Sequence, residues 1–103
     1  MTTLDDIRAR AIPIIKNDAR ELSRIIVFGS YAKGTQVKGS DLDIYVDGRL
    51  EYRLDELQDT EEKLSEVLST PVDLLTRTAL QNSVIRESLQ KSIEEDGVVL
   101  YGG

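Results

Sequence analysis

The chain of 103 residues contains no cysteine and no histidine. The lack of cysteine excludes disulfides, thiolate nucleophiles and zinc sites built from cysteine. The lack of histidine excludes an imidazole base, a Ser-His-Asp triad and histidine metal ligands. Any catalysis must therefore depend on carboxylates, hydroxyls, lysine or arginine, together with a hard metal ion that prefers oxygen ligands.

Long apolar runs are also missing. No run approaches the roughly 18 residues of a membrane span, and the acidic N-terminus lacks the features of a secretory signal. We therefore expect a cytoplasmic protein. Leu, Ile, Val and Phe make up 31 of the 103 residues, which lies above the roughly 20% floor of disordered chains. At this length we expect one folded domain over residues 1–103.

Basic charge is scarce, because 13 lysines and arginines face 19 acidic residues and the net charge is −6. This balance argues against direct binding of nucleic acid, which requires a basic surface. Residues 1–40 nevertheless carry a net charge of +3, whereas residues 41–103 carry −9. The first part can therefore meet an anion such as a nucleotide phosphate, and the second part a cation.

The hydrophobic pattern mixes helices and strands along the chain. Thr3 and Asp6 can cap a first helix, and Pro13 is expected to kink it or divide it in two. Strands are predicted at three apolar segments, with a further strand or packed tail near the C-terminus: residues 24–28, 41–46, 72–75 and 98–101. This mixture predicts an α/β (α+β) fold in which a small mixed sheet carries helices packed mainly on one side.

Two further helices are predicted in the second half of the chain. Residues 53–68 place leucines on one stripe, and their other face carries acidic residues that we interpret as solvated surface: Asp55, Glu56, Asp59, Glu61, Glu62 and Glu66. Thr78 and Gln81 form a capping box for a last helix. That helix runs through Ile85, Leu89 and Ile93 and ends at Gly97.

The chemistry centres on the strand that begins at Asp41. On a strand, residues i and i+2 share a face, so Asp41 and Asp43 point the same way while Leu42 and Ile44 point the other way. Two like charges side by side repel each other, and a bound divalent cation reverses that interaction. A third carboxylate, Asp73, stands among apolar residues, where an unpaired charge is expected to be costly.

Gly29 and Ser30 follow directly on a buried strand, and ten residues separate Ser30 from Asp41. Gly29 allows a backbone to approach a ligand closely, and Ser30 offers a hydroxyl and an N–H to a phosphate oxygen. Three carboxylates on short strands beside such a turn match the needs of a phosphoryl-transfer site with two metal ions. Taken singly, a Gly-Ser pair is commonly a simple turn, an Asp-x-Asp pair commonly faces solvent, and a residue such as Asp73 is commonly an edge residue. Only the combination of the three indicates a catalytic site.

Two competing phosphate motifs fail. Gly29 and Gly34 have the spacing of a P-loop, but Thr35 and Gln36 stand where Lys and Ser or Thr are needed. The sequence also has no Gly-x-Gly-x-x-Gly motif. Some transferases of sugar nucleotides use an Asp-x-Asp pair, but they need a much larger domain than this chain can form.

At these residues the sequence resembles the minimal nucleotidyltransferases (MNT) of the DNA polymerase β-type nucleotidyltransferase superfamily. The resemblance rests on Gly29-Ser30, ten intervening residues, Asp41-x-Asp43 and a later strand with Asp73, and it extends from the first helix to Tyr101. One small departure is Lys33, where many relatives place Arg with the same charge. The resemblance implies the nucleotidyltransferase fold and the antitoxin role in HEPN/MNT toxin–antitoxin pairs.

The resemblance also implies roles for individual residues. Gly29 and Ser30 would bind the terminal phosphates of ATP, and Asp41, Asp43 and Asp73 would be the catalytic residues that ligate two Mg²⁺ ions. Asp73 would also help to deprotonate the acceptor hydroxyl. The implied reaction moves AMP from ATP to a hydroxyl of a partner HEPN toxin, with Tyr as the expected acceptor. Larger transferases hold the acceptor in an extra helical domain, for which this chain has no residues, so a partner must supply it.

Two other functions are compatible with the same residues. The chain can be a non-catalytic antitoxin that neutralises its partner by binding alone, although the presence of all three carboxylates argues against decay of the site. It can also be a transferase for a small hydroxylated molecule, against which the missing acceptor domain counts. Enzymatic transfer to a protein partner is the function that the sequence favours.

Overall fold

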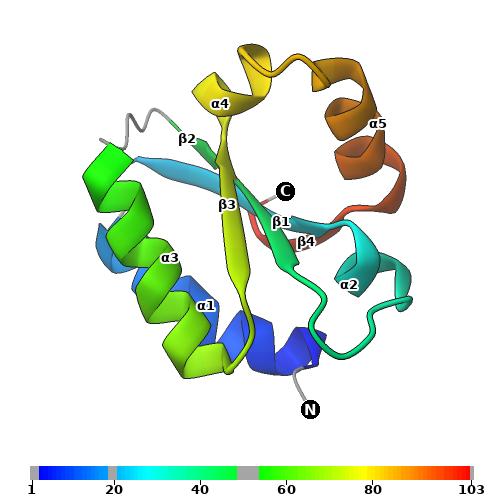
Figure 1. Ribbon diagram of the computed structural model, residues 1–103. Coiled ribbons are helices and arrows are strands. Elements are labelled where there is room, and N and C mark those ends of the chain that lie inside the picture. The colour runs from blue at the N-terminus through cyan, green and yellow to red at the C-terminus, as the bar shows by residue number, and fades with distance from the viewer. Residues whose placement is uncertain (1–2, 19–20, 49–53, 103) are drawn as a thin grey trace.

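The computed structural model describes residues 3–18, 21–48 and 54–102 (Figure 1). Its centre is a four-stranded mixed sheet in the order β3-β2-β1-β4. Strand β1 (Leu22–Phe28) pairs antiparallel with both β2 (Leu42–Gly48) and β4 (Val98–Tyr101), whereas β3 (Val72–Thr76) runs parallel to β2. All four predicted strand segments are confirmed, and the C-terminal one forms an edge strand.

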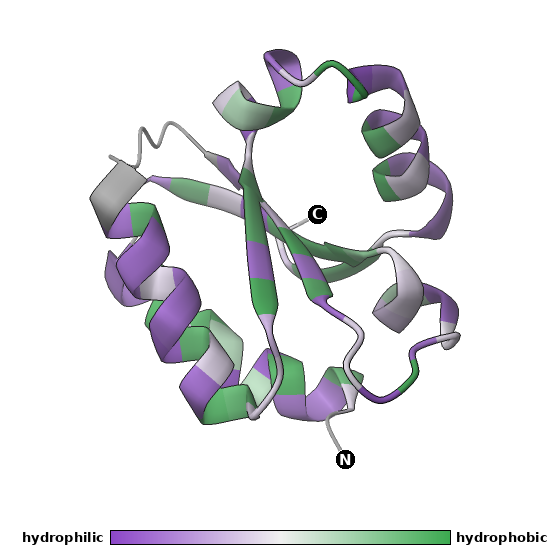
Figure 2. Ribbon diagram, viewed as in Figure 1, coloured by the Kyte–Doolittle hydropathy of each residue, from purple (hydrophilic) through white to green (hydrophobic). Residues whose placement is uncertain are grey.

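Helices α1 (Leu4–Asp18) and α3 (Leu54–Leu68) pack together on one face of the sheet (Figure 1). Alternate strand residues point into this larger core, among them Val27, Leu42 and Ile44, each fully buried. Figure 2 shows hydrophobic residues along the strands and hydrophilic residues on the outward side of α3. The predicted mixed sheet with packed helices is confirmed, and the larger core lies on this face. Arg53, the first residue predicted in α3, lies outside the described residues.

Helix α1 is a single helix that contains Pro13, so the predicted division into two helices is wrong. Proline removes one backbone donor and strains the preceding turn, but Pro13 is exposed, where water can satisfy the carbonyl freed one turn earlier. The buried residues Ile7, Ala11 and Ile15 hold both halves of the helix against the sheet. At its start, the predicted cap forms, because the Asp6 N–H donates to Thr3 Oγ1 at 3.1 Å.

The opposite face carries a smaller core under α4 (Arg77–Gln81) and α5 (Arg86–Asp96). Its buried members come from four elements, β1, β2, α4 and α5: Ile26, Phe28, Tyr45, Leu80 and Ile93. The predicted last helix is therefore two helices. The cap of α4 is Thr76, whose hydroxyl accepts a hydrogen bond from the Ala79 N–H at 3.2 Å, rather than Thr78. Gly97 ends α5 as predicted.

None of the helices formed by the described residues is both long enough and apolar enough to cross a bilayer.

Candidate active site

The turn at Gly29 and Ser30 joins β1 to the short helix α2 (Ser30–Lys33). Gly29 has φ +74°, a conformation that side chains other than glycine rarely adopt. A Cβ added at Gly29 would also overlap Oδ2 of Asp43. The positive φ favours glycine here, and the backbone of the turn lies directly against the Asp43 carboxylate, which would have to rotate away from any added side chain. Lys33, at the other end of α2, forms an ion pair with Asp96 of α5 at 3.6 Å.

Strand register brings the predicted carboxylates into one region. Asp43 pairs with Phe28 on one side and with Asp73 on the other, so Asp43 and Asp73 stand opposite each other on parallel strands. Asp41 lies one residue before β2 and is exposed. Since Leu42 and Ile44 point into the main core, Asp43 points to the other face of the sheet, as predicted.

Asp41, Asp43 and Asp73 place negative charges near one another. Burial, together with the charges of Asp73 and Asp41, raises the pKa of Asp43 to about 6. Asp73 itself is exposed, which corrects the expectation that its apolar neighbours shield it. Its side chain leaves the sheet on the face opposite Val72 and Leu74, which are buried.

Carboxylate oxygens are the ligands that Mg²⁺ prefers, so the donor set fits a hard divalent cation. A cation would also remove the repulsion that raises the pKa of Asp43. Across residues 3–18, 21–48 and 54–102, no three acidic side chains converge closely enough to form a metal site by themselves.

Glu61 is a carboxylate of this region that the sequence interpretation assigned to the solvated face of α3. It is partly buried, and its Oε2 accepts a hydrogen bond from the Leu74 N–H at 3.1 Å. Burial raises the pKa of Glu61, the Leu74 N–H lowers it and the neighbouring Asp73 raises it, with a net increase. The spacing of residues 57, 61, 64 and 68 is that of one helical stripe, which is the signal that could have placed Glu61 inward.

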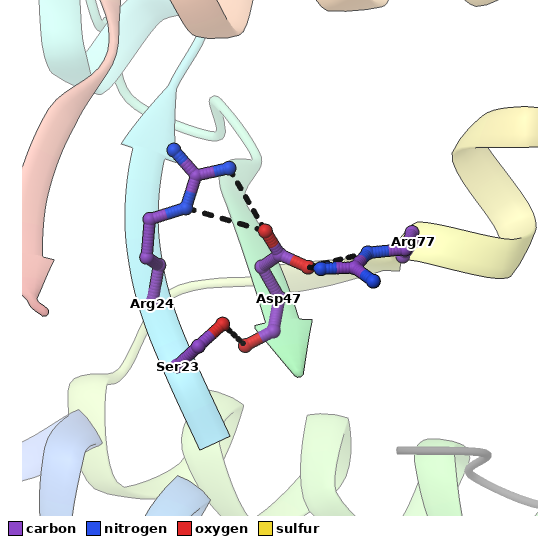
Figure 3. A network of polar contacts seen from close by, with 4 residues as sticks. All are labelled: Ser23, Arg24, Asp47 and Arg77. Carbon is purple, nitrogen blue, oxygen red and sulfur yellow. Dashed lines mark hydrogen bonds and ion pairs between the residues drawn. The ribbon is translucent and has the colours of Figure 1, made fainter. Parts of the chain in front are cut away.

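A second carboxylate on β2, Asp47, lies four residues after Asp43 and therefore on the same face of the strand. Figure 3 shows Asp47 between Arg24 and Arg77. Arg24 donates to its Oδ2 from Nε and Nη2 at 3.2 and 2.8 Å, and Arg77 donates to its Oδ1 from Nε at 2.7 Å. Burial acts to raise the pKa of Asp47, but the hydrogen bonds from Arg24 and Arg77 outweigh it and lower the pKa. This cluster ties the start of α4 to β1 and β2, and the sequence interpretation did not identify it.

Comparison with known proteins gives relatives of the same size. A protein of Methanocaldococcus jannaschii, provisionally named protein adenylyltransferase MJ0126, is 35% identical over 102 residues, covering 93% of this chain and 96% of the relative. Protein adenylyltransferase MntA of Thermococcus cleftensis is 31% identical over 96 residues, covering 90% of this chain and 96% of that protein.

Among solved structures, the crystal structure of a toxin–antitoxin with AMP-PNP matches with a TM-score of 0.79 and 27% identity, over 97% of this chain and 75% of that chain. A second solved structure is a tri-AMPylated Shewanella oneidensis HEPN toxin in complex with MNT antitoxin. The matched chain of that complex has the same fold, with a TM-score of 0.72 and 22% identity over 93% of this chain and 70% of that chain. The sequence matches the nucleotidyltransferase domain family over residues 10–100. With its sheet, its Gly29-Ser30 turn and its opposed aspartates, this chain belongs to the nucleotidyltransferase domain family.

Proposed function

We propose that the protein is a Mg²⁺-dependent adenylyltransferase that moves AMP from ATP to a hydroxyl, that of a tyrosine, on a partner HEPN toxin, and so acts as an antitoxin. One observation carries the proposal. Asp43 stands in register with Asp73 and directly against Gly29, and the pKa of Asp43 is raised to about 6 by burial and by two other carboxylates. Such an uncompensated acidic group beside a phosphate-type turn is typical of a functional site.

The residues take the following roles in this proposal. Gly29 leaves room for the triphosphate, and Ser30 donates hydrogen bonds to its oxygens. Asp41, Asp43 and Asp73 would hold two Mg²⁺ ions, and bound metal would supply positive charge to the triphosphate and its leaving group. The acceptor oxygen attacks the α-phosphorus, the bond from that phosphorus to the bridging oxygen breaks, and pyrophosphate leaves with the bond electrons. Of the two aspartates that lie on strands, Asp43 and Asp73, the more exposed is Asp73, and it takes the proton of the acceptor hydroxyl.

The nature of the partner is supported by the relatives. Two curated relatives carry the name protein adenylyltransferase, and a structural neighbour is an MNT antitoxin in complex with an AMPylated HEPN toxin. The exposed position of Asp73 suits an acceptor that arrives on another chain. A protein hydroxyl can therefore reach the acidic groups without any rearrangement of the sheet.

The test combines the protein, its cognate toxin, Mg²⁺ and ATP labelled in the α-phosphate. We expect label on a toxin tyrosine in the wild type, and a loss of at least about 100-fold in Asp73→Asn, since several kcal/mol of transition-state stabilisation depend on the metal site. Asp59→Asn is the matched control, because Asp59 is an exposed aspartate on α3. If Asp73→Asn silences the toxin fully while it transfers nothing, neutralisation occurs by contact and the enzymatic role is wrong.

A further inference from the structure

Strand β3 is an edge of the sheet, so every second N–H group along it faces away from β2. The Leu42 N–H bonds to the Pro71 carbonyl at 2.8 Å, which places the groups of Pro71 and Asp73 on the β2 side. Val72 and Leu74 therefore direct their N–H groups outward. Unpaired groups of this kind leave a strand free to shift or to pair wrongly.

Helix α3 satisfies both outward donors with side chains. The Val72 N–H donates to Ser65 Oγ at 3.1 Å, and the Leu74 N–H donates to Glu61 Oε2 at 3.1 Å. Ser65 Oγ in turn donates to the Glu61 carbonyl at 2.8 Å, so its hydroxyl is used in both directions. We refer to Glu61 and Ser65 as the edge clamp.

The spacing of the edge clamp matches the spacing of the strand. Residues i and i+4 of a helix are separated by about 6 Å along its axis, and residues i and i+2 of a strand by about 6.6 Å. One turn of α3 therefore meets two successive outward donors of β3. The residue between those donors is Asp73, whose Cα partner on β2 is Asp43.

We propose that Glu61 and Ser65 are positioning residues, which hold β3 on both sides of Asp73 and thereby fix Asp73 opposite Asp43 for catalysis. The proposal rests on the proposed function, because it assigns the clamp a role in adenylyl transfer. It distinguishes Glu61 from its neighbour Glu62, which is exposed on the same helix. If both residues belonged only to a solvated acidic face, their substitution should affect transfer equally. The edge clamp predicts that transfer falls on substitution of Glu61 but not of Glu62.

The experiment compares Glu61→Ala, Glu61→Gln, Ser65→Ala and the control Glu62→Ala in the full chain. Hydrogen exchange of the Leu74 and Val72 amides is measured by NMR without metal or nucleotide, and transfer to the toxin is measured as kcat and as KM for ATP. We expect Glu61→Ala to speed Leu74 exchange by about 10-fold, the value of one lost hydrogen bond. We also expect its kcat to fall by about 10-fold, as for other residues that orient a metal ligand, with KM within about twofold.

Ser65→Ala should show the same pattern with Val72 as the faster amide. Glu61→Gln keeps an acceptor oxygen, so it should restore slow Leu74 exchange and most of kcat, and Glu62→Ala should match the wild type. The proposal is overturned if Leu74 exchange rises in Glu61→Ala while kcat stays unchanged, or if Glu61→Gln is as slow in transfer as Glu61→Ala. A wild type that transfers nothing, with the exchange results as expected, contradicts the proposed function and leaves the clamp as an edge support only.

Discussion

Asp43 and Asp47 lie on the same strand and the same face, four residues apart, and their surroundings are opposite. Asp47 is buried and receives hydrogen bonds from Arg24 and Arg77, and its pKa is lowered. Asp43 is only partly buried, and burial with the negative charges of Asp73 and Asp41 raises its pKa to about 6. At one end of the face a carboxylate is neutralised by two arginines, and at the other end carboxylates stand near each other.

This difference separates a structural carboxylate from a functional one. A buried acidic group that is fully paired contributes to the geometry of the fold, and removal of one partner leaves an uncompensated charge. A group of acidic residues without such pairing is unfavourable in the protein alone, and it is expected where a cation or a substrate completes the site. Substitutions at the two ends should therefore act on different properties of the protein.

Asp43→Asn should have the largest effect on activity. We expect transfer to fall by about 1000-fold, equivalent to about 4 kcal/mol, because a central ligand of the proposed metal site is lost. The metal-free protein should be unchanged or more stable by up to about 1 kcal/mol, since an unfavourable charge is removed and solvent screens it in part. Labelled ATP with toxin measures the first effect, and urea unfolding measures the second. A variant that keeps most of its transfer rate would contradict the assignment.

Asp47→Asn is the matched change at the other end of the face. We expect the free energy of unfolding to fall by about 1–2 kcal/mol, because the charge-assisted hydrogen bonds from Arg24 and Arg77 are weakened while the two half-exposed guanidinium groups stay solvated. Transfer at a temperature where the variant is folded should stay within about threefold of the wild type. Urea unfolding and toxin labelling on the same sample check both parts. Loss of transfer in a fully folded Asp47→Asn variant would show that this end also belongs to the catalytic site.

Asp43 and Asp47 should contribute to the pH dependence of the free energy of unfolding with opposite signs. These contributions are the smallest of the expected effects. Burial, Asp73 and Asp41 raise the pKa of Asp43 from its ordinary 3.8 to about 6. Its ionisation therefore opposes folding of the metal-free protein progressively as the pH rises from about 4 to 6. Asp43→Asn should gain stability over the wild type across this window, by at most about 1 kcal/mol.

For Asp47 the lowered pKa gives the reverse sign. Its contribution to stability is present above the ordinary pKa of 3.8 and is lost as the pH falls below that value. Urea unfolding of the wild type and both variants between about pH 2 and 7 gives the two differences. Added Mg²⁺ should abolish the gain in Asp43→Asn, because a bound cation removes the repulsion. Differences of the same sign for both variants would contradict the comparison.

Much of the fold was accessible from local pattern. The strand at 24–28 was predicted from its apolar run, and Ile25–Phe28 are all buried. The alternation after Asp41 correctly placed Leu42, Ile44 and Val46 in the main core. The motif and the family resemblance predict that Gly29-Ser30 lies close to Asp43. In the structure the Gly29 backbone lies against the Asp43 carboxylate. These features depend on periodicity and on short spacings along the chain.

The errors concern the boundaries of helices and the surroundings of single residues. Thr78 and Gln81 have the pattern of a cap, but Thr76 occupies the position where β3 ends and α4 begins. Pro13 stays within a single helix because buried residues on both sides of it pack on the sheet. Asp73 is exposed despite apolar neighbours, since those neighbours point to the opposite face.

The sequence alone determined the order of the four strands and of helices α1 and α3, the alternation of β2 between its two faces and the residue types of the candidate site. Periodicity and spacing are local properties, and the chain carries them before it folds. Only the tertiary structure decided that Asp43 faces Asp73, that Asp47 is paired with two arginines and that Glu61 holds the edge of β3. The charge state and the role of a carboxylate depend on groups that are far away in sequence, and packing alone brings these groups together.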